Sequence, residues 1–187
     1  MKAKSKASDT VTATAVMVPS SQDRVGLGGV FTVTCFDADG NQKWAEDFHN
    51  LVVNVGLKFI NDTIFSGSGY TAAWYIGLVN DPATYDATDT MTSHAGWTEN
   101  VSYSQSARPT LSFGSATNAD PSVIAATAAT FSMNASGTIA GAFVTTNSTK
   151  SGTSGTLLSA GDFVGIARPF TSGDTLNVTY SFSADAA

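Results

Sequence analysis

Apolar and polar residues alternate along much of this chain, and that alternation is typical of β-strands that bury one face. Over residues 30–36, apolar side chains occupy the odd positions and threonines two of the even ones. Turn-forming residues follow at 37–41, and an alternating run resumes over 43–48. The sequence therefore predicts a β-hairpin over residues 30–48.

Helical spacing of apolar residues is convincing in a single stretch, residues 50–65. The residues that recur at this spacing are Val55, Phe59, Ile60 and Ile64. Asn54 is a favourable N-cap, and a Ser/Gly run follows Phe65. We expect one short helix at 54–65.

The pattern of the remaining sequence is typical of strands that are joined by turns. A buried strand is expected at 73–79, and a long polar stretch follows over 80–100, with a short helical turn at 88–95 and Trp97 as an anchoring aromatic. Later runs rich in Thr, Val, Ile and Phe are separated by turn residues. These runs are 110–114, 130–134, 138–146, 162–168 and 175–183.

These patterns predict an all-β fold, an antiparallel sandwich of jelly-roll-like order with one short helix. Residues 29–187 would form the sandwich domain. Residues 1–28 combine a basic start, an alternation of Thr, Ala and Val over 11–18, and glycines at 26 and 28, with Gly29 directly after them. We expect an extended N-terminal arm that contains one possible strand and is tethered by a glycine-rich joint.

The charge of the chain limits its partners. Nine Lys and Arg stand against fifteen Asp and Glu among 187 residues, a net charge of −6. Such a chain repels phosphate backbones and anionic lipid, so we expect neither nucleic acid nor membrane as a partner. No 18-residue apolar run exists, and threonines interrupt the region after the basic start where a signal peptide would be apolar. We expect synthesis in the cytoplasm.

The sequence offers little support for a disulfide or a metal site. The only cysteine, Cys35, lies on the apolar face of a predicted strand and reads as a core residue. Asp37, Asp39 and Asn41 superficially resemble a calcium loop, but the glycine comes fourth instead of sixth and no glutamate stands twelfth. A plain hairpin turn is the better interpretation. Histidines occur only at 49 and 94, too few for a zinc site. We expect no metal and no cofactor.

Catalytic patterns are equally weak. Ser68 has glycines around it but is out of frame for a nucleophile elbow and follows a helix instead of a strand. Glu46 and Glu99 are the only glutamates, so the sequence does not favour a glycosidase with paired carboxylates. We expect no enzymatic activity.

Aromatic residues and two arginines are the remaining candidates for binding. Arg108 and Arg168 each precede a proline, and each could pair with a carboxylate of a neighbouring chain or simply cover the rim of the domain. The aromatic rings could form a carbohydrate platform or an interface, or could anchor core and loops. These rings are Trp44, Trp74, Trp97, Tyr75, Tyr85 and Tyr103.

A pattern of structural residues over about residues 29 to 183 resembles the head-decoration and related structural proteins of tailed bacteriophages. The segments that carry this resemblance are 29–41, Trp44, Phe48, 50–52, 56–57, 75–78, 89–91, 93–94, 97–99, Arg108, 161–162 and 173–176. The resemblance implies a small β-rich subunit assembled on the virion, either as capsid cement, often trimeric, or as part of a fibre or tail. Because long fibrous repeats are lacking, the capsid role is favoured.

The resemblance thus predicts a decoration protein that binds the major capsid protein as a homotrimer on the outer capsid surface, after synthesis in the host cytoplasm. The alternative is a tail or head-fibre adhesin module that binds host glycan through Trp74, Trp97 and tyrosines. The candidate residues for contact with the capsid or with another subunit are Lys2, Lys4, Lys6, Arg24, Trp97, Arg108 and Arg168.

Overall fold

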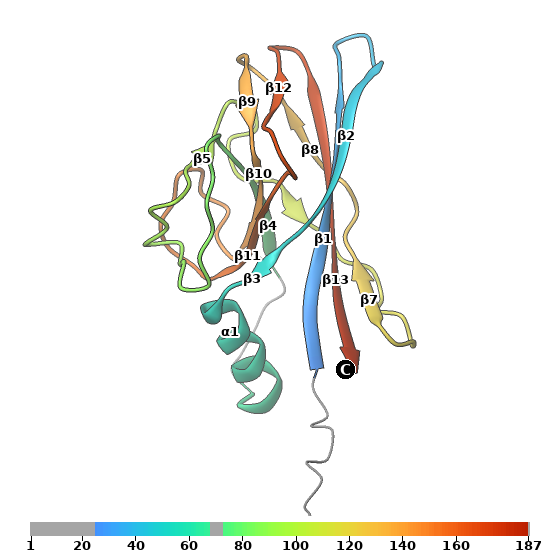
Figure 1. Ribbon diagram of the computed structural model, residues 1–187, viewed down its shortest axis with the longest axis vertical. Helices are drawn as coiled ribbons and strands as arrows, with labels where there is room; N and C mark the ends of the chain where they lie inside the picture. Colours follow the sequence, from blue (N-terminus) through green and yellow to red (C-terminus); the bar gives the residue numbers. More distant parts are fainter. Residues whose placement is uncertain (1–24, 68–72, 187) are drawn as a thin grey trace, which may run out of the picture.

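A computed structural model describes residues 25–67 and 73–186 (Figure 1). Its strands form two main antiparallel sheets. The first sheet has the spatial order β2 (Gln42–His49), β1 (Val25–Phe36), β13 (Thr175–Ala186) and β7 (Ser122–Ala125), and β8 (Ala129–Ser132) also pairs with β13. The first and last of these strands in the sequence, β1 and β13, are neighbours along their whole length, from Val25 opposite Ala186 to Phe36 opposite Thr175.

The second sheet stands beside the first (Figure 1). Its order is β3 (Leu51–Val52), β11 (Leu157–Asp162), β10 (Gly141–Thr145), β4 (Trp74–Val79) and β5 (Glu99–Asn100), and β6 (Thr110–Leu111) also pairs with β4. A small third sheet joins β12 (Arg168–Phe170) to β9 (Gly137–Ile139). The prediction of an all-β antiparallel sandwich with one short helix is confirmed.

The core lies between the two main sheets, as the strand alternation requires. Phe31, Val33 and Cys35 of β1 have no exposed surface, and their neighbours in the sequence are partly exposed. Tyr180 of β13 stands opposite Phe31, with the ring centroids 4.7 Å apart. Cys35 is therefore a core residue, as predicted.

The helix α1 (Asn54–Phe65) has the predicted bounds. It packs against β11 at Gly56, where a Cβ atom would come within 2.4 Å of the Leu158 carbonyl oxygen. The predicted cap is wrong: the N-cap residue is Val53, and no side chain caps this end. Asn54 already belongs to the helix, and its backbone N–H donates to the Ala87 carbonyl instead.

The long segment 80–98 is held by local turns. The helical turn expected at 88–95 is absent, because Thr90 and Ser93 exchange reciprocal backbone hydrogen bonds of 2.9 and 3.2 Å that close a tight turn. Trp97 anchors the segment as predicted, with 2 % of its surface exposed. In the described part of the chain, no helix is long and apolar enough to cross a bilayer.

Two strand predictions need correction. The strand expected at 162–168 is wrong, because β11 ends at Asp162 and β12 begins only at Arg168, with Gly165 between them at a φ of +103°. The strand expected at 138–146 is two strands, β9 and β10, in different sheets. The strands β7 and β11 were not predicted in these positions.

The expected glycine-rich joint is part of the domain. Residues 25–28, assigned to the arm, pair with β13, and so does Gly29. Glycine is needed at position 29 because a Cβ there would lie 2.7 Å from the Tyr180 hydroxyl. The predicted boundary between residues 28 and 29 is therefore wrong, and the domain begins at residue 25 or before it. The rest of the predicted arm, residues 1–24, lies outside the described residues.

Candidate functional site

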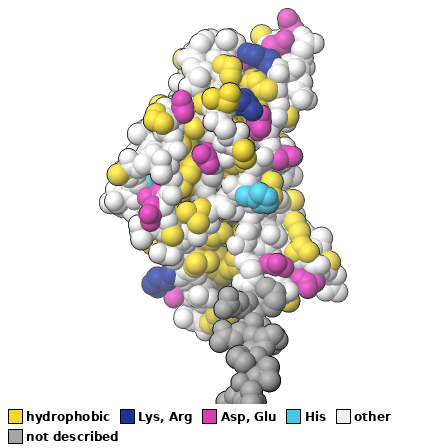
Figure 2. Space-filling view, in the orientation of Figure 1, with side chains coloured by type: hydrophobic (Ala, Val, Ile, Leu, Met, Phe, Trp, Pro, Cys, Tyr) yellow, Lys and Arg dark blue, Asp and Glu magenta, His cyan; other side chains and the backbone are white. Residues whose placement is uncertain are grey.

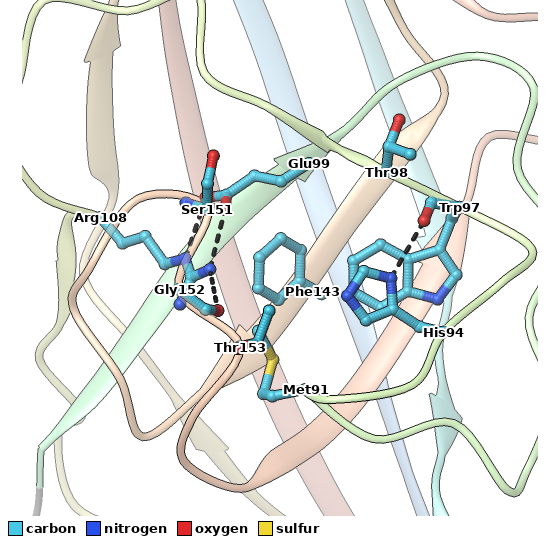
Figure 3. Close-up of a pocket in the computed structure, with 10 residues that line it drawn as sticks. All are labelled: Met91, His94, Trp97, Thr98, Glu99, Arg108, Phe143, Ser151, Gly152 and Thr153. Carbon is cyan, nitrogen blue, oxygen red and sulfur yellow. Dashed lines mark hydrogen bonds and ion pairs between the residues drawn. The ribbon is translucent and has the colours of Figure 1, made fainter.

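Arg108 and Glu99 form a buried ion pair behind a hollow of about 240 Å³ (Figure 3). The Arg108 Nε and one terminal nitrogen donate to the two Glu99 carboxylate oxygens, both at 2.9 Å. The guanidinium also donates to the backbone carbonyls of Asn147 and Gly152, at 2.9 and 3.0 Å. The Ser151 N–H adds a 2.6 Å hydrogen bond to Glu99. This clamp ties the loop after β10 to the strand β5.

The clamp corrects one prediction about partners. Arg108 has 2 % of its surface exposed, and its guanidinium carbon lies 5.1 Å from the centre of the Phe143 ring, within the same chain. Because the bidentate geometry is complete within the chain, Arg108 has no free face for a carboxylate of a neighbouring subunit. Its assignment as a contact residue is wrong.

The other wall of the hollow is a stack of His94 on Trp97 (Figure 3). The two ring centroids are 3.9 Å apart, and His94 Nδ1 lies 3.0 Å from the Trp97 carbonyl oxygen. The Trp97 indole N–H donates to Asp89 at 3.0 Å. Trp97 is thus a buried loop anchor, and its assignment as a contact residue is also wrong.

The polar groups around this hollow are mostly engaged with one another. Glu99 and Arg108 neutralise each other, and one His94 nitrogen is engaged by a backbone carbonyl. Acid–base or nucleophilic catalysis uses a group within hydrogen-bond reach of a reacting atom, and the described contacts instead tie these groups to the scaffold. The arrangement supports a structural role for the hollow.

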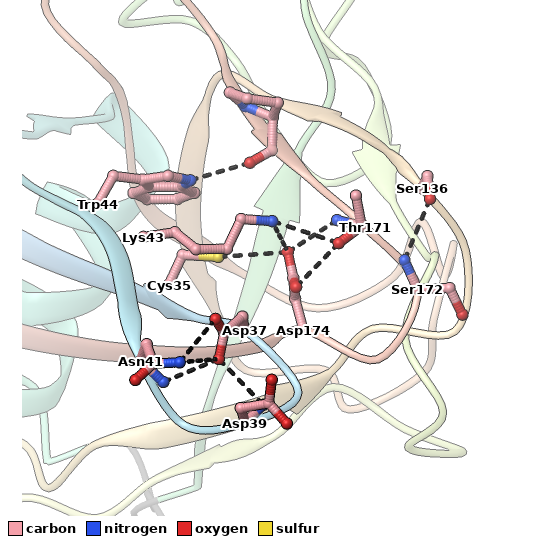
Figure 4. Close-up of polar contacts among 11 residues, drawn as sticks. Cys35, Asp37, Asp39, Asn41, Lys43, Trp44, Ser136, Thr171, Ser172 and Asp174 are labelled. Carbon is pink, nitrogen blue, oxygen red and sulfur yellow. Dashed lines mark hydrogen bonds and ion pairs between the residues drawn. The ribbon is translucent and has the colours of Figure 1, made fainter.

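A second polar cluster surrounds Asp174 next to the β1–β2 hairpin (Figure 4). Lys43 Nζ lies 2.6 Å from the Asp174 carboxylate, and the Thr171 N–H and hydroxyl donate to it at 2.8 and 2.9 Å. Burial alone would raise the pKa of Asp174, but the hydrogen bonds from Lys43 and Thr171 outweigh it and lower that pKa. The Lys43 pKa is raised by its hydrogen bond to Asp174, so both partners are held in their charged forms.

The Cys35 thiol joins this cluster without being reactive. It lies 3.6 Å from the Asp174 carboxylate. Burial, with the negative charge of Asp174 as a second cause, raises the pKa of Cys35 to about 12. A thiol so rarely ionised is neither a nucleophile nor a metal ligand at neutral pH.

The Asp37 turn is a hairpin turn, as predicted. Its carboxylate accepts hydrogen bonds from the Asp39 N–H at 3.0 Å and from the Asn41 N–H at 2.8 Å. The Asn41 side-chain amide also donates to it, and these bonds lower the Asp37 pKa. Across the described ranges, no group of three or more His, Cys, Asp or Glu side chains is arranged to hold a metal ion.

Arg168 is the only predicted contact residue in the described ranges whose side chain is partly exposed, with 25 % of it accessible. It pairs with Glu46 and donates to the Ile166 carbonyl at 3.3 Å. Lys2, Lys4, Lys6 and Arg24 lie outside the described residues.

Four of the six aromatic rings considered as a sugar platform pack against other parts of the fold. Trp97 and Tyr103 have 2 % and 1 % of their surface exposed. Trp44 stacks edge-on against Phe163, and its indole N–H donates to the Pro169 carbonyl at 2.9 Å. Trp74 packs edge-on against Phe59. The alternative in which these rings anchor core and loops is therefore the better one.

Two strongly exposed apolar side chains close together in the chain were not singled out in the sequence. Val164 and Ile166, with 83 % and 73 % of their surfaces exposed, flank Gly165 between β11 and β12; we call these three residues the knob. The signal was Gly165, which breaks the alternation of the predicted strand 162–168. An apolar groove at the α1 end of the molecule was also missed, because its walls come from distant segments.

Among the described residues, basic side chains on the surface are paired within the chain, whereas many acidic side chains are not. In the described ranges, all five basic side chains are engaged: Lys43, Lys58, Arg108 and Arg168 with carboxylates, and Lys150 with the carbonyls of Tyr103 and Gln105. Acidic side chains are spread over the face shown in Figure 2, whereas basic ones are few. The free charge of the domain surface is therefore negative.

Comparison with known proteins returns no relative: no family model, no curated protein and no solved structure matches this chain.

Proposed function

We propose that this protein is a virion structural protein, a decoration protein that binds the outer surface of a tailed-bacteriophage capsid and stabilises its lattice of major capsid protein. It acts as a homotrimer through surface contact, with no catalytic step and no cofactor. The sequence resemblance motivates this proposal, and the knob is the observation that carries it, because it offers apolar surface on a rigid base.

The base of the knob is fixed on both sides. Phe163, directly before it, is buried and packs edge-on against Trp44 and Phe48 at centroid distances of 5.8 and 5.0 Å. After it, Arg168 is held by Glu46. A side chain that is already ordered loses little conformational entropy on binding, so exposed aliphatic groups on a fixed base favour association.

Many copies of a modest contact suffice for a decoration protein. The knob alone offers far less than the roughly 800 Å² per partner of a standard stable interface. On a symmetric shell, each trimer would bind through several such contacts at once, and multivalency multiplies their effect. The negative surface of the domain would favour a basic or neutral capsid surface.

Incorporation into particles tests the proposal. We expect a Val164→Asp/Ile166→Asp double variant to be incorporated into virions at least tenfold less than the wild type, as measured by quantitative mass spectrometry of purified particles. Phe65→Asp is the matched control, since Phe65 is equally exposed but lies at the end of α1. We expect its incorporation to be unchanged, at hundreds of copies per particle.

Particle stability gives the second measurement. Particles that lack the protein should break at lower temperature and under milder osmotic shock than complete particles. Equal survival with and without the protein would overturn the proposal, and so would normal incorporation of the double variant. A count of only a few copies per particle would favour the adhesin alternative.

A further inference from the structure

An apolar groove of about 260 Å³ opens between the two sheets at the end of the molecule where α1 lies. One wall is formed by Tyr180 and Phe182 of β13 with Ile124 of β7. The facing wall includes Trp74 of β4, Leu158 of β11 and Ile60 of α1. No charged side chain from the described ranges lines it.

The size of the groove fits apolar side chains better than water. An apolar cavity of about 150 Å³ remains dry and admits benzene, so this groove has room for roughly two aliphatic side chains. Water in it would have few polar partners, because the lining is almost wholly apolar. An apolar occupant would remove this surface from water and stabilise the protein.

The chain itself supplies an apolar segment within reach. Residues 1–24 precede β1, and β1 begins at the groove end of the sandwich (Figure 1). Gly29 pairs with Phe182 of the groove, so Val25 lies four residues, about 13 Å, further along the strand. The seven-residue step from Val18 to Val25 spans up to about 23 Å, which is enough to return to the groove.

Charge favours the same occupant. Four of the nine basic residues but only two of the fifteen acidic ones fall in residues 1–24. The acids Asp120 and Asp185 stand where β1 begins: Asp185 pairs with Gly26, and Asp120 accepts a 3.1 Å hydrogen bond from the Ala186 N–H. Neither forms an ion pair with a described residue. A basic segment is therefore attracted to this end.

We propose that the groove binds the apolar segment 11–18 of the same polypeptide chain. The connection to Val25 gives this segment an effective concentration of the order of millimolar, far above that of a free second copy in dilute solution. Alternation places Met17 with Val11, Ala13 and Ala15, and places Thr12 and Thr14 on the opposite side. The Met17 side of the segment faces the groove. This docking is a property of the single chain and does not depend on the virion role.

A disulfide trap tests the docking in the full-length protein. We expect Met17→Cys/Ile124→Cys to form an intramolecular disulfide under mild oxidation, seen as a faster band on a non-reducing gel and a mass lower by two hydrogens. The native Cys35 stays silent, because it is fully buried and its pKa is raised to about 12. In the control Met17→Cys/Ile166→Cys, the second cysteine lies in the knob, and we expect cross-linking at least tenfold slower.

A second test uses no engineered cysteines, so that it does not depend on the folding of the double-cysteine variant. We expect Met17→Asp to increase binding of the dye ANS several-fold by leaving the groove open, and Thr12→Asp to leave it unchanged. A disulfide-linked dimer as the main product would assign the groove to a second copy and overturn the proposal. Equal cross-linking of trap and control would overturn it, and so would equal dye binding by the two aspartate variants.

Discussion

Two arginines that look alike in the sequence have different surroundings in the fold. Arg108 and Arg168 both precede a proline, and both pair with a glutamate of their own chain. In the Arg108 pair, 1 % of the arginine side chain and 7 % of the glutamate side chain are exposed. In the Arg168 pair the values are 25 % and 23 %. Both arginines stand in an Arg-Pro dipeptide, and the two ion pairs differ in how deeply they are buried.

Burial changes the energetics of the pair. Removing one partner of a buried pair leaves an uncompensated charge in a medium that solvates it poorly, whereas an exposed partner is re-solvated by water and screened by salt. The Arg108 pair therefore belongs to the scaffold, and the Arg168 pair belongs to the surface beside the knob. Two predictions test this division directly, and two more extend it to the Asp174 cluster and to the knob; they are given from the largest effect to the smallest.

Loss of Glu99 should have the largest effect. We expect Glu99→Ala to lower the free energy of unfolding by about 3–5 kcal/mol, because it strands the buried Arg108 guanidinium and frees the Ser151 N–H. Urea unfolding followed by circular dichroism measures this. The double variant Glu99→Leu/Arg108→Met removes both charges and should recover most of the loss. A loss below about 1 kcal/mol for Glu99→Ala would show that water reaches the pair.

The second-largest effect is expected at Asp174, whose contribution to stability should be lost in acid. Since the folded-state pKa of Asp174 is lowered, its contribution is present above the unfolded value of 3.8 and is lost as the pH falls through the folded value. We expect Asp174→Asn to lower the free energy of unfolding at pH 7 by about 1.5–3 kcal/mol. We also expect it to flatten the loss of wild-type stability below about pH 4. Urea midpoints from pH 7 to pH 2 test this, and parallel curves for the two proteins would contradict it.

Loss of Glu46 should have a small effect. We expect Glu46→Ala to lower the free energy of unfolding by about 0–1 kcal/mol, because water solvates Arg168 once its partner is gone. The difference from Glu99→Ala, measured in the same urea series, is the direct test of the comparison. A loss of 3 kcal/mol here would mean that burial does not separate the two pairs.

The alternation of side chains was enough to predict the sandwich. A strand with one buried face needs only a period of two, and β1, β2 and β13 carry it clearly. The helix was equally predictable from spacing. Its cap was not, because the Asn54 N–H is satisfied by the Ala87 carbonyl, a contact between segments 33 residues apart in the chain.

The candidate sites depended on contacts that a single sequence does not contain. Arg108 reaches Asn147 and Gly152 across the fold, so its burial could not be inferred from its neighbours in the chain. The groove combines residues from α1 and four strands. The strand prediction at 162–168 also failed because apolar residues around Gly165 fit a strand as well as an exposed turn.

Substitution in the knob should change stability no more than loss of Glu46 does. Both side chains lie in water in the folded protein, so Val164→Asp/Ile166→Asp should change the free energy of unfolding by no more than about 0.5 kcal/mol per substitution. Urea unfolding of the purified variant measures this. A loss of 2 kcal/mol or more would mean that the knob packs within its own chain. If the variant keeps its stability but is lost from virions, the apolar surface of the knob serves association, because folding no longer accounts for its presence.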